Sequence, residues 1–263
     1  MLFGDKEIDF IELLQDLDYS EIYIPNNSDF VKTVLESIHN PKIWNECWIN
    51  SSGKSDPPPD FYSEKYMLMM DVMRVNDHER KGKKGKLYNP DMAYERELYK
   101  HLLESGNLQQ FPNAKVYLNG YTQLPTNKDH TYKMYKNNFL RVIKKHIESI
   151  PLYQKNHIGY KTVFFVFDES SAYVQLSDRY KADKQYKAGQ KFEGVPHLFF
   201  LDEEFLNAFR KKKIDYLFWM APYKFIQTLT GTYDLPKLII FDLSFDYTNS
   251  IVYNENKMIS VEI

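Results

Sequence analysis

The chain has 263 residues, of which 43% are hydrophobic, 27% charged and 16% aromatic, a composition typical of a soluble globular protein. A folded monomer of this size buries about three-quarters of the surface that the unfolded chain exposes, which allows one large core. The 34 basic and 36 acidic residues leave a net charge of −2, which excludes a global field that would attract nucleic acid or a membrane.

The first part of the chain predicts a helix, a short ambiguous segment and a rigid loop. Ser28 suits a helix N-cap, and apolar residues follow it at helical spacing until Asn40 and Pro41 end the run. Residues 43–49 fit either a short helix or a strand. Residues 51–60 form a loop, because their successive prolines are incompatible with helices and with strand ladders.

The middle of the chain predicts strands and helices in alternation. The apolar run Tyr66–Val75 predicts a largely buried strand, and the lysines and glycines of Lys81–Lys86 predict a mobile basic loop. A helix then runs from Pro90 to Gly106, and a short strand covers Lys115–Tyr121. A long helix follows from Tyr132 to Ile150, where the next residue, a proline, stops it.

Three apolar runs of the second half are each followed by an aspartate. These runs are Val163–Phe167 before Asp168, Leu198–Leu201 before Asp202, and Leu238–Phe241 before Asp242. A helix from Asp202 to Lys213 and another apolar strand, Tyr216–Ala221, separate the last two. Continuous apolar strands are buried on both faces, and here helices alternate with them. We therefore predict a single α/β domain over residues 1–263, with a mixed central β-sheet flanked by helices.

The C-terminal tail alternates apolar and polar residues in two stretches, 250–253 and 258–261. Such alternation is typical of a half-buried strand. With a turn at residues 254–256, the two stretches predict an antiparallel hairpin at an edge of the sheet.

The sequence lacks the motifs of several enzyme classes. No strand is followed by a Gly-rich phosphate loop, and no serine stands in a Gly-flanked nucleophile elbow. The seven histidines include no pair at metal-ligand spacing on a helix. His146 falls on the apolar face of its helix, as a hydrogen-bonded core histidine would, whereas His78 follows Asp77 just after a predicted strand.

Chemically capable residues are densest between Asp60 and Glu97. Asp71 and Arg74 lie within an otherwise apolar strand and point to opposite faces, so they do not pair with each other. Burying Asp71 without a partner is costly, which predicts that a Mg²⁺ ion or a lysine compensates its charge. Glu95 or Glu97, on the following helix, would pair with Arg74.

A proline followed by Asp60 ahead of a strand, and then an acid, Asp71, within the next strand, resembles the PD-(D/E)XK phosphodiesterase superfamily. In that family two acids hold one or two divalent cations on a central mixed sheet flanked by helices. A lysine two residues after the second acid positions the attacking water, and an upstream helix often adds a glutamate. The resemblance implies that Asp60 and Asp71 bind Mg²⁺ or Mn²⁺ in a nuclease. Met73 occupies the lysine position, and Arg74 lies one residue later on the other face of the strand.

The basic residues after this strand suit the same chemistry. A divalent cation polarises a phosphoryl oxygen and lowers the pKa of a bound water. A run of basic side chains beside it would bind the phosphate backbone of a nucleic acid. The candidate phosphate-binding residues are Arg80, Lys81, Lys83, Lys84 and Lys86.

A second candidate site lies at the carboxyl ends of the predicted strands, where ligands bind in open α/β sheets. If these strands are parallel neighbours, Asp168, Asp202 and Asp242 gather there and attract a cation. Asp202 also suits the N-cap of the following helix. Asp168 and Glu169 are the stronger functional candidates, because the chain from Ser170 continues as strand or turn.

Three classes of function remain open. The first is a metal-dependent nuclease or phosphodiesterase that uses Asp60, Asp71 and a third acid such as Glu95 or Asp168. The second is a non-enzymatic binding or accessory protein of a phage or mobile element, in which the acids are structural partners. The third is an α/β enzyme that acts on a small molecule at Asp168 and Glu169. With no apolar run of about 20 residues, no secretion signal and one cysteine, we expect a cytoplasmic protein without membrane association.

Overall fold

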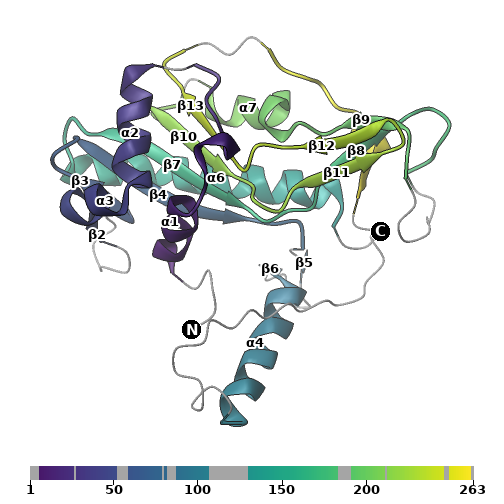
Figure 1. Ribbon diagram of the computed structural model, residues 1–263, viewed down its shortest axis with the longest axis horizontal. Helices are drawn as coiled ribbons and strands as arrows, with labels where there is room; N and C mark the ends of the chain where they lie inside the picture. Colours follow the sequence, from purple (N-terminus) through teal and green to yellow (C-terminus); the bar gives the residue numbers. More distant parts are fainter. Residues whose placement is uncertain are drawn as a thin grey trace.

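The computed structural model describes residues 6–26, 28–51, 59–78, 80–81, 87–106, 130–182, 191–210, 212–245 and 249–261. Within these ranges the chain is an α/β structure with a seven-stranded mixed sheet, flanked by helices, and three small antiparallel sheets beside it (Figure 1). The predicted fold class is therefore confirmed. None of the helices in the described ranges has both the length and the apolar character needed to span a membrane.

The central sheet contains three parallel strands at its middle. In spatial order the strands are β1 (Ile22–Tyr23), β13 (Leu238–Asp242), β10 (Tyr216–Met220), β7 (Lys161–Asp168), β4 (Leu68–Val75), β3 (Phe61–Ser63) and β2 (Ile49–Asn50). β10, β7 and β4 are parallel neighbours, whereas β13 runs antiparallel to β10. β2, β3 and β4 form an antiparallel meander at one side of the sheet. The parallel strands β4, β7 and β10 thus end at the same edge.

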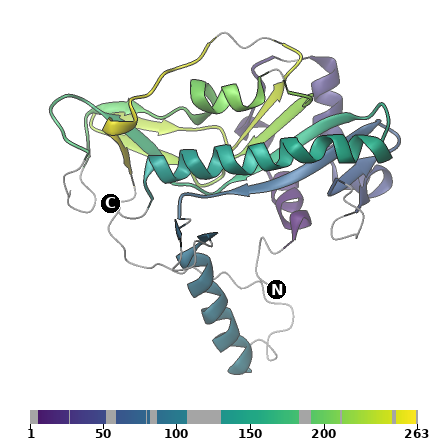
Figure 2. The same ribbon diagram turned by 180° about the vertical axis from the view of Figure 1, so that it is seen from behind.

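Helices cover both faces of this sheet (Figure 1, Figure 2). They are α1 (Glu7–Gln15), α2 (Asp29–His39), α3 (Pro41–Cys47), α6 (Tyr132–Asn156) and α7 (Glu203–Phe209). α6 and α7 share one apolar core with the sheet, and α1, α2 and α3 share another on the opposite face. A further helix, α4 (Pro90–Glu104), projects away from the sheet (Figure 1).

The remaining elements are short. The small sheets contain β5 (Arg80–Lys81) with β6 (Leu87–Tyr88), β11 (Phe225–Thr228) with β12 (Gly231–Asp234), and β8 (Tyr173–Leu176) with β9 (Gly194–Pro196) and β14 (Met258–Ser260). Three 3-10 helices are η1 (Tyr19–Glu21), η2 (Phe199–Leu201) and η3 (Glu255–Lys257). β5 and β6 connect β4 to α4, and β8 follows β7.

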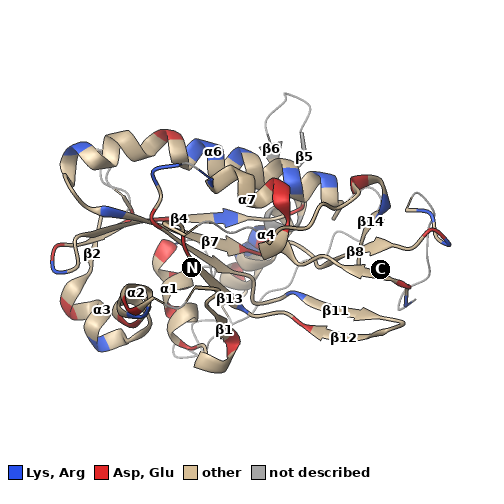
Figure 3. Ribbon diagram, turned by 90° about the horizontal axis from the view of Figure 1, so that it is seen from above, with Lys and Arg blue, Asp and Glu red and all other residues tan. Residues whose placement is uncertain are grey.

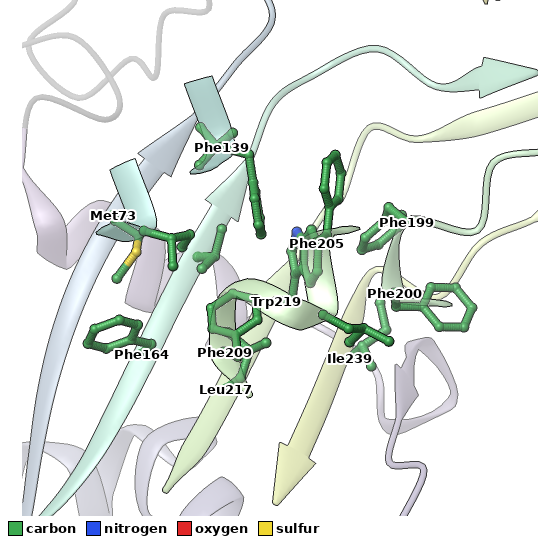
Figure 4. Close-up of a cluster of buried hydrophobic side chains, with 14 of the residues drawn as sticks. Met73, Phe139, Phe164, Phe199, Phe200, Phe205, Phe209, Leu217, Trp219 and Ile239 are labelled. Carbon is green, nitrogen blue, oxygen red and sulfur yellow. The ribbon is translucent and has the colours of Figure 1, made fainter. Parts of the chain in front are cut away.

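Aromatic side chains fill the core between the sheet and α6. Figure 4 shows this cluster, in which Phe139 of α6 stacks on Phe205 of α7, with ring centroids 4.5 Å apart. Phe139 also stacks on Trp219 of β10 at 4.8 Å. Met73 of β4 contributes to the same cluster. The odd-numbered residues of β4 therefore face α6, and this direction decides where Asp71 points.

Two helix starts follow from their capping residues. Ser28 Oγ accepts a hydrogen bond from the backbone amide of Val31, which starts α2 as predicted. The side chain of Asp202 accepts from the backbone amide of Glu204 and caps α7. The segment 43–49 resolves into the end of α3 and the start of β2, because Asn40 caps a helix that ends at Cys47.

The apolar run Leu198–Leu201, predicted as a strand, is instead the 3-10 helix η2, and the strand prediction is wrong. The turn buries Phe199 and Phe200 together, so apolar area is removed from water without a strand partner. The following helix ends at Phe209 rather than Lys213, because Phe209 is its last buried residue and charged residues follow.

α6 continues past Ile150 to Asn156, so the prediction that Pro151 stops it is also wrong. Ile150 and Tyr153, on either side of the proline, are both buried. The packing of this last turn therefore outweighs the backbone hydrogen bond that the proline removes.

The C-terminal antiparallel edge strand is confirmed, but its partner differs from the prediction. β14 pairs with β8, whose residues are mostly buried, and not with residues 250–253. Ile251 instead forms an isolated bridge with Asp202, and η3 occupies the predicted turn. The predicted strand Lys115–Tyr121 and residues 82–86 of the predicted mobile loop lie outside the described residues.

Phe165→Ala should lower the free energy of unfolding by about 3–5 kcal/mol, as expected for a large-to-small change in a core. Phe165 lies in β7 and is fully buried. The matched control is Phe225→Ala, at a phenylalanine that is 53% exposed, where we expect a change within about 0.5 kcal/mol. Urea unfolding of both variants measures the difference, and a loss below about 1 kcal/mol at Phe165 would contradict the assignment of β7 as a central strand.

Candidate functional site

Asp60 and Asp71, the two acids of the sequence pattern that resembles PD-(D/E)XK, lie opposite each other. Asp60 precedes β3 and Asp71 lies within β4, and the antiparallel pairing of Phe61 with Met70 brings the two acids across from each other. Oδ2 of Asp60 accepts a hydrogen bond from the backbone amide of Val72 at 2.8 Å. A hydrogen bond also joins the two carboxyl groups. Asp60 and Asp71 therefore form one site on the central sheet.

Their proximity changes the protonation of Asp60. Burial and the charge of Asp71 raise the pKa of Asp60 to about 8, against the smaller opposing effect of the Val72 amide. Glu7, the first residue of α1, adds a weaker repulsion that also raises the pKa of Asp60. At neutral pH Asp60 therefore holds a proton, which it can donate to the Asp71 carboxylate.

A histidine from α6 completes the surroundings of Asp71. Nδ1 of His146 lies 2.7 Å from Oδ2 of Asp71. The Asp71 side chain is 5% exposed and that of His146 is 20% exposed, so the pair reaches from the core toward solvent. Burial and the charge of Asp71 raise the pKa of Tyr153, one of the α6 tyrosines, above its ordinary range. The basic side chain at Asp71 is thus a histidine and not the lysine that we predicted.

Arg74 has a different partner from the predicted one. Its guanidinium binds Glu169 through two bonds, one from Nε and one from Nη2 to Oε1 at 2.8 Å. Glu169 follows β7, and the parallel pairing of β4 with β7 places the two residues at the same edge. Burial raises the pKa of Glu169, and the smaller effect of the Arg74 charge and hydrogen bond lowers it. The predicted pairing of Arg74 with Glu95 or Glu97 is therefore wrong.

Other predicted site residues lie away from Asp60 and Asp71. Glu95 and Glu97 lie on α4, which projects from the sheet (Figure 2), and Glu97 is near His101 of the same helix. Val75 follows Asp71 by four residues, so the end of β4 is about 13 Å further along the strand. Arg80 and Lys81 form β5 beyond that end, and Lys83, Lys84 and Lys86 lie outside the described residues.

The three strand-end aspartates do not gather. Asp242 ends β13, which is antiparallel, and its partner Tyr216 also pairs with Val163 near the start of β7, so Asp242 lies at the opposite edge from Asp168. Asp168 is buried, and its oxygens accept hydrogen bonds from Tyr135 at 2.5 Å, from Trp219 at 3.0 Å and from Ser170. Asp202 caps α7 and contacts His197 at 2.8 Å.

No protein-family model, curated protein or solved structure matches this chain. The resemblance to the PD-(D/E)XK superfamily therefore rests on the sequence pattern of Asp60 and Asp71.

The pH dependence of stability should report the proton on Asp60. The folded protein retains this proton up to about pH 8, whereas the unfolded chain releases it near the ordinary pKa of 3.8. Stability should therefore fall as the pH rises from about 4 to about 8, by at most about 1.4 kcal/mol per pH unit. Asp60→Asn removes the titrating group, so its unfolding free energy should vary less steeply with pH in this window.

Urea unfolding at pH 5, 6, 7 and 8 measures both slopes. Asp29→Asn, at an exposed aspartate of α2, is the matched control and should keep the wild-type slope. Parallel pH curves for the wild type and Asp60→Asn would show that Asp60 titrates normally.

Proposed function

We propose that the chain is a metal-dependent phosphodiesterase that cleaves nucleic acid, with Asp60 and Asp71 as the residues that hold its divalent cation. The observation that carries the proposal is the juxtaposition of these two acids across β3 and β4, in a mixed sheet that helices cover on both faces. If the register of β3 with β4 placed Asp60 and Asp71 apart, the two acids could not bind one cation, whatever the sequence pattern.

The donor atoms suit Mg²⁺ or Mn²⁺. Mg²⁺ binds carboxylate oxygens and commonly uses only one or two carboxylates, with water and substrate phosphate completing its shell. Among the described residues, no third acid or histidine has a donor atom that forms a group with one of Asp60 and one of Asp71 in which all three lie within 4.8 Å of one another. Water and substrate phosphate would therefore supply the remaining ligands of the cation. When bound, such a cation polarises the phosphoryl oxygen and lowers the pKa of the attacking water.

Two further side chains, Glu7 and His146, support the assignment, whereas Met73 departs from the family pattern. Glu7 lies at the start of α1, upstream of Asp60 in the sequence, and its charge is a minor cause of the raised pKa of Asp60; an upstream helix that adds a glutamate is also a feature of the family. Met73, at the lysine position, is apolar and 2% exposed, so it cannot position a water. His146 lies over the same face of β4, and the hydrogen bond between its Nδ1 and the accepting Oδ2 of Asp71 fixes its ring. An imidazole oriented in this way can accept a proton from water when it is neutral.

The helix that carries His146 offers a surface for phosphates. α6 has a single acid, Glu148, and its basic residues are Lys133, Lys136, Arg141, Lys144, Lys145 and Lys155. Arg141, Lys144 and Lys145 are exposed and lie within five residues of His146. Figure 3 shows the predominance of basic residues along α6. A local positive surface of this kind attracts a nucleic acid backbone even though the whole chain has a net charge of −2.

A non-enzymatic binding protein is the second candidate, and one observation favours it. The proton on Asp60 and the imidazole of His146 already compensate both carboxyl groups without a cation. In that case the acids would stabilise the sheet, and the basic surface of α6 would bind without cleavage. Thermal unfolding with metal and a cleavage assay separate the two candidates.

Mg²⁺ or Mn²⁺ should raise the melting temperature of the wild-type protein. A ligand that binds only the folded state, at 100 times its Kd, stabilises by about 2.7 kcal/mol. Asp71→Asn should abolish this gain, whereas Asp29→Asn should retain it. The gain is compared within each variant, because Asp71→Asn also removes the partner of His146 and lowers stability by itself. A wild-type melt that does not respond to either metal would favour the binding protein.

Cleavage of single- and double-stranded DNA and of RNA, with Mn²⁺ present, tests the reaction. Asp60→Asn and Asp71→Asn should abolish cleavage, and His146→Gln should lower kcat by about 10²–10⁴, the usual effect of losing a general base. Lys144→Ala combined with Lys145→Ala should mainly weaken binding and reduce its salt dependence. Glu97→Gln, on α4, is the control. Equal cleavage by the wild type and Asp71→Asn would contradict the proposal.

A further inference from the structure

Three potential metal ligands converge just beyond the carboxyl end of β4. Asp77 and His78 follow this strand, and His130 lies directly before α6. In the described part of the chain this is the one group of three acid or histidine side chains whose donor atoms all lie within 4.8 Å of one another. We propose that Asp77, His78 and His130 bind a divalent first-row transition metal such as Zn²⁺, at a site separate from Asp60 and Asp71.

The distances suit one shared ion. Oδ1 of Asp77 lies 3.3 Å from Nε2 of His78 and 3.9 Å from Nδ1 of His130. The two imidazoles meet edge to face, with ring centroids 4.0 Å apart. Around a tetrahedral zinc ion, with bonds of about 2.0–2.2 Å, neighbouring ligand atoms are roughly 3.4 Å apart. The two distances from Oδ1 of Asp77 therefore lie within about half an ångström of this value, and no two of the three donor atoms are more than 4.8 Å apart.

Asp77 is held in the orientation that such a ligand needs. Its side chain is fully buried, and Oδ2 accepts hydrogen bonds from the Ser171 amide at 2.8 Å and the Tyr173 hydroxyl at 2.5 Å. Oδ1 accepts no hydrogen bond of normal geometry, and it is turned toward the two imidazoles. A buried carboxylate oxygen that makes no hydrogen bond of normal geometry and faces two imidazoles is a donor that a metal ion can bind together with them. Hydrogen bonds to the far oxygen are how proteins orient a carboxylate ligand.

The backbone also holds His130 in place. His130 has φ +53, a left-handed conformation that residues other than glycine seldom adopt and that is concentrated at functional sites. The next residue, Thr131, caps α6 by accepting from the Met134 amide at 3.2 Å. Asn138 of α6 donates to the backbone carbonyl of Asn76 at 2.8 Å and so ties α6 to the end of β4. Residues distant in sequence are therefore positioned together before any metal binds.

The donor set selects the class of metal. Two imidazole nitrogens and one carboxylate oxygen suit Zn²⁺, Fe²⁺ or Mn²⁺, whereas Mg²⁺ and Ca²⁺ prefer oxygen ligands throughout. The side chains of His78 and His130 are 17% and 15% exposed, whereas Oδ1 of Asp77 and Nδ1 of His130 are buried, so a bound ion would lie just below the surface.

The site lies apart from the proposed Mg²⁺ site. Val75, the last residue of β4, lies four residues and so about 13 Å beyond Asp71, and Asp77 follows it. The proposal does not depend on the nuclease activity, because it uses no residue of the Asp60 and Asp71 pair.

Equilibrium dialysis of metal-free protein against Zn²⁺, with a large excess of Mg²⁺, tests the site. We expect one equivalent of bound Zn²⁺. His78→Gln and His130→Gln should each weaken Zn²⁺ binding at least tenfold, and Asp77→Asn should do the same if it folds. Because both histidines are partly exposed, their variants decide the question even if Asp77→Asn unfolds. Co²⁺ should give visible absorption bands with the wild type that both histidine variants lose.

Two controls identify the ligands. His101→Gln changes an exposed histidine of α4, and Asp71→Asn changes the other proposed site, so both should bind Zn²⁺ as the wild type does. Less than about 0.1 equivalent of Zn²⁺ in the wild type, or wild-type affinity in both His78→Gln and His130→Gln, would overturn the proposal. Neither result would bear on cleavage that depends on Asp71.

Discussion

Asp71 places a carboxylate inside the central sheet, between Met69 and Met73 on the face that α6 covers, and the surrounding groups are arranged around its charge. Asp60 reaches it from the neighbouring strand as a protonated acid, and His146 reaches it from α6 at 2.7 Å. Without these partners the charge would cost several kcal/mol to bury. The same arrangement keeps the carboxyl groups of Asp60 and Asp71 close together. A cation that binds both groups would replace the proton of Asp60.

The position of α6 links this site to the rest of the fold. α6 crosses from the end of β4 to the start of β7 and supplies His146, exposed basic residues and the residue before its N-cap, His130. Phe139 fixes the helix on the sheet through its contacts with Phe205 and Trp219 (Figure 4). A single packed helix therefore connects both candidate metal sites, and a shift of its register would alter both.

Local patterns predicted the long central strands and the helices α2, α4, α6 and α7, because burial on both faces makes such strands continuously apolar. The short strands β1, β3, β9, β11 and β12 were not predicted. β7 and β10 lie where such runs occur, and the caps at Ser28 and Asp202 follow from local hydrogen bonding. The strand prediction failed at Leu198–Leu201, since four apolar residues can be buried by a turn as well as by a ladder. α1 was not predicted, although Phe10, Ile11 and Leu14 are spaced as one buried helical face.

The site could be predicted only in part. Asp60 and Asp71 stand out in the sequence, but their proximity depends on the register of β3 with β4. His146 was interpreted as a core histidine, because nothing local shows that its helix lies over Asp71. No sequence pattern indicated His130 as a metal ligand, because Asp77 and His78 are more than 50 residues earlier in the chain. The direction of β13, which separates Asp242 from Asp168, is likewise set by tertiary structure and not by hydrophobic pattern.

Anomalous diffraction from crystals grown with Mn²⁺ would test the central claim most directly, because it locates the cation without reference to activity. A peak within about 2.3 Å of one carboxylate oxygen of Asp60 and one of Asp71 is the predicted result. Crystals without such a peak, in which Asp60 and Asp71 still share a hydrogen bond and His146 still binds Asp71, would contradict it.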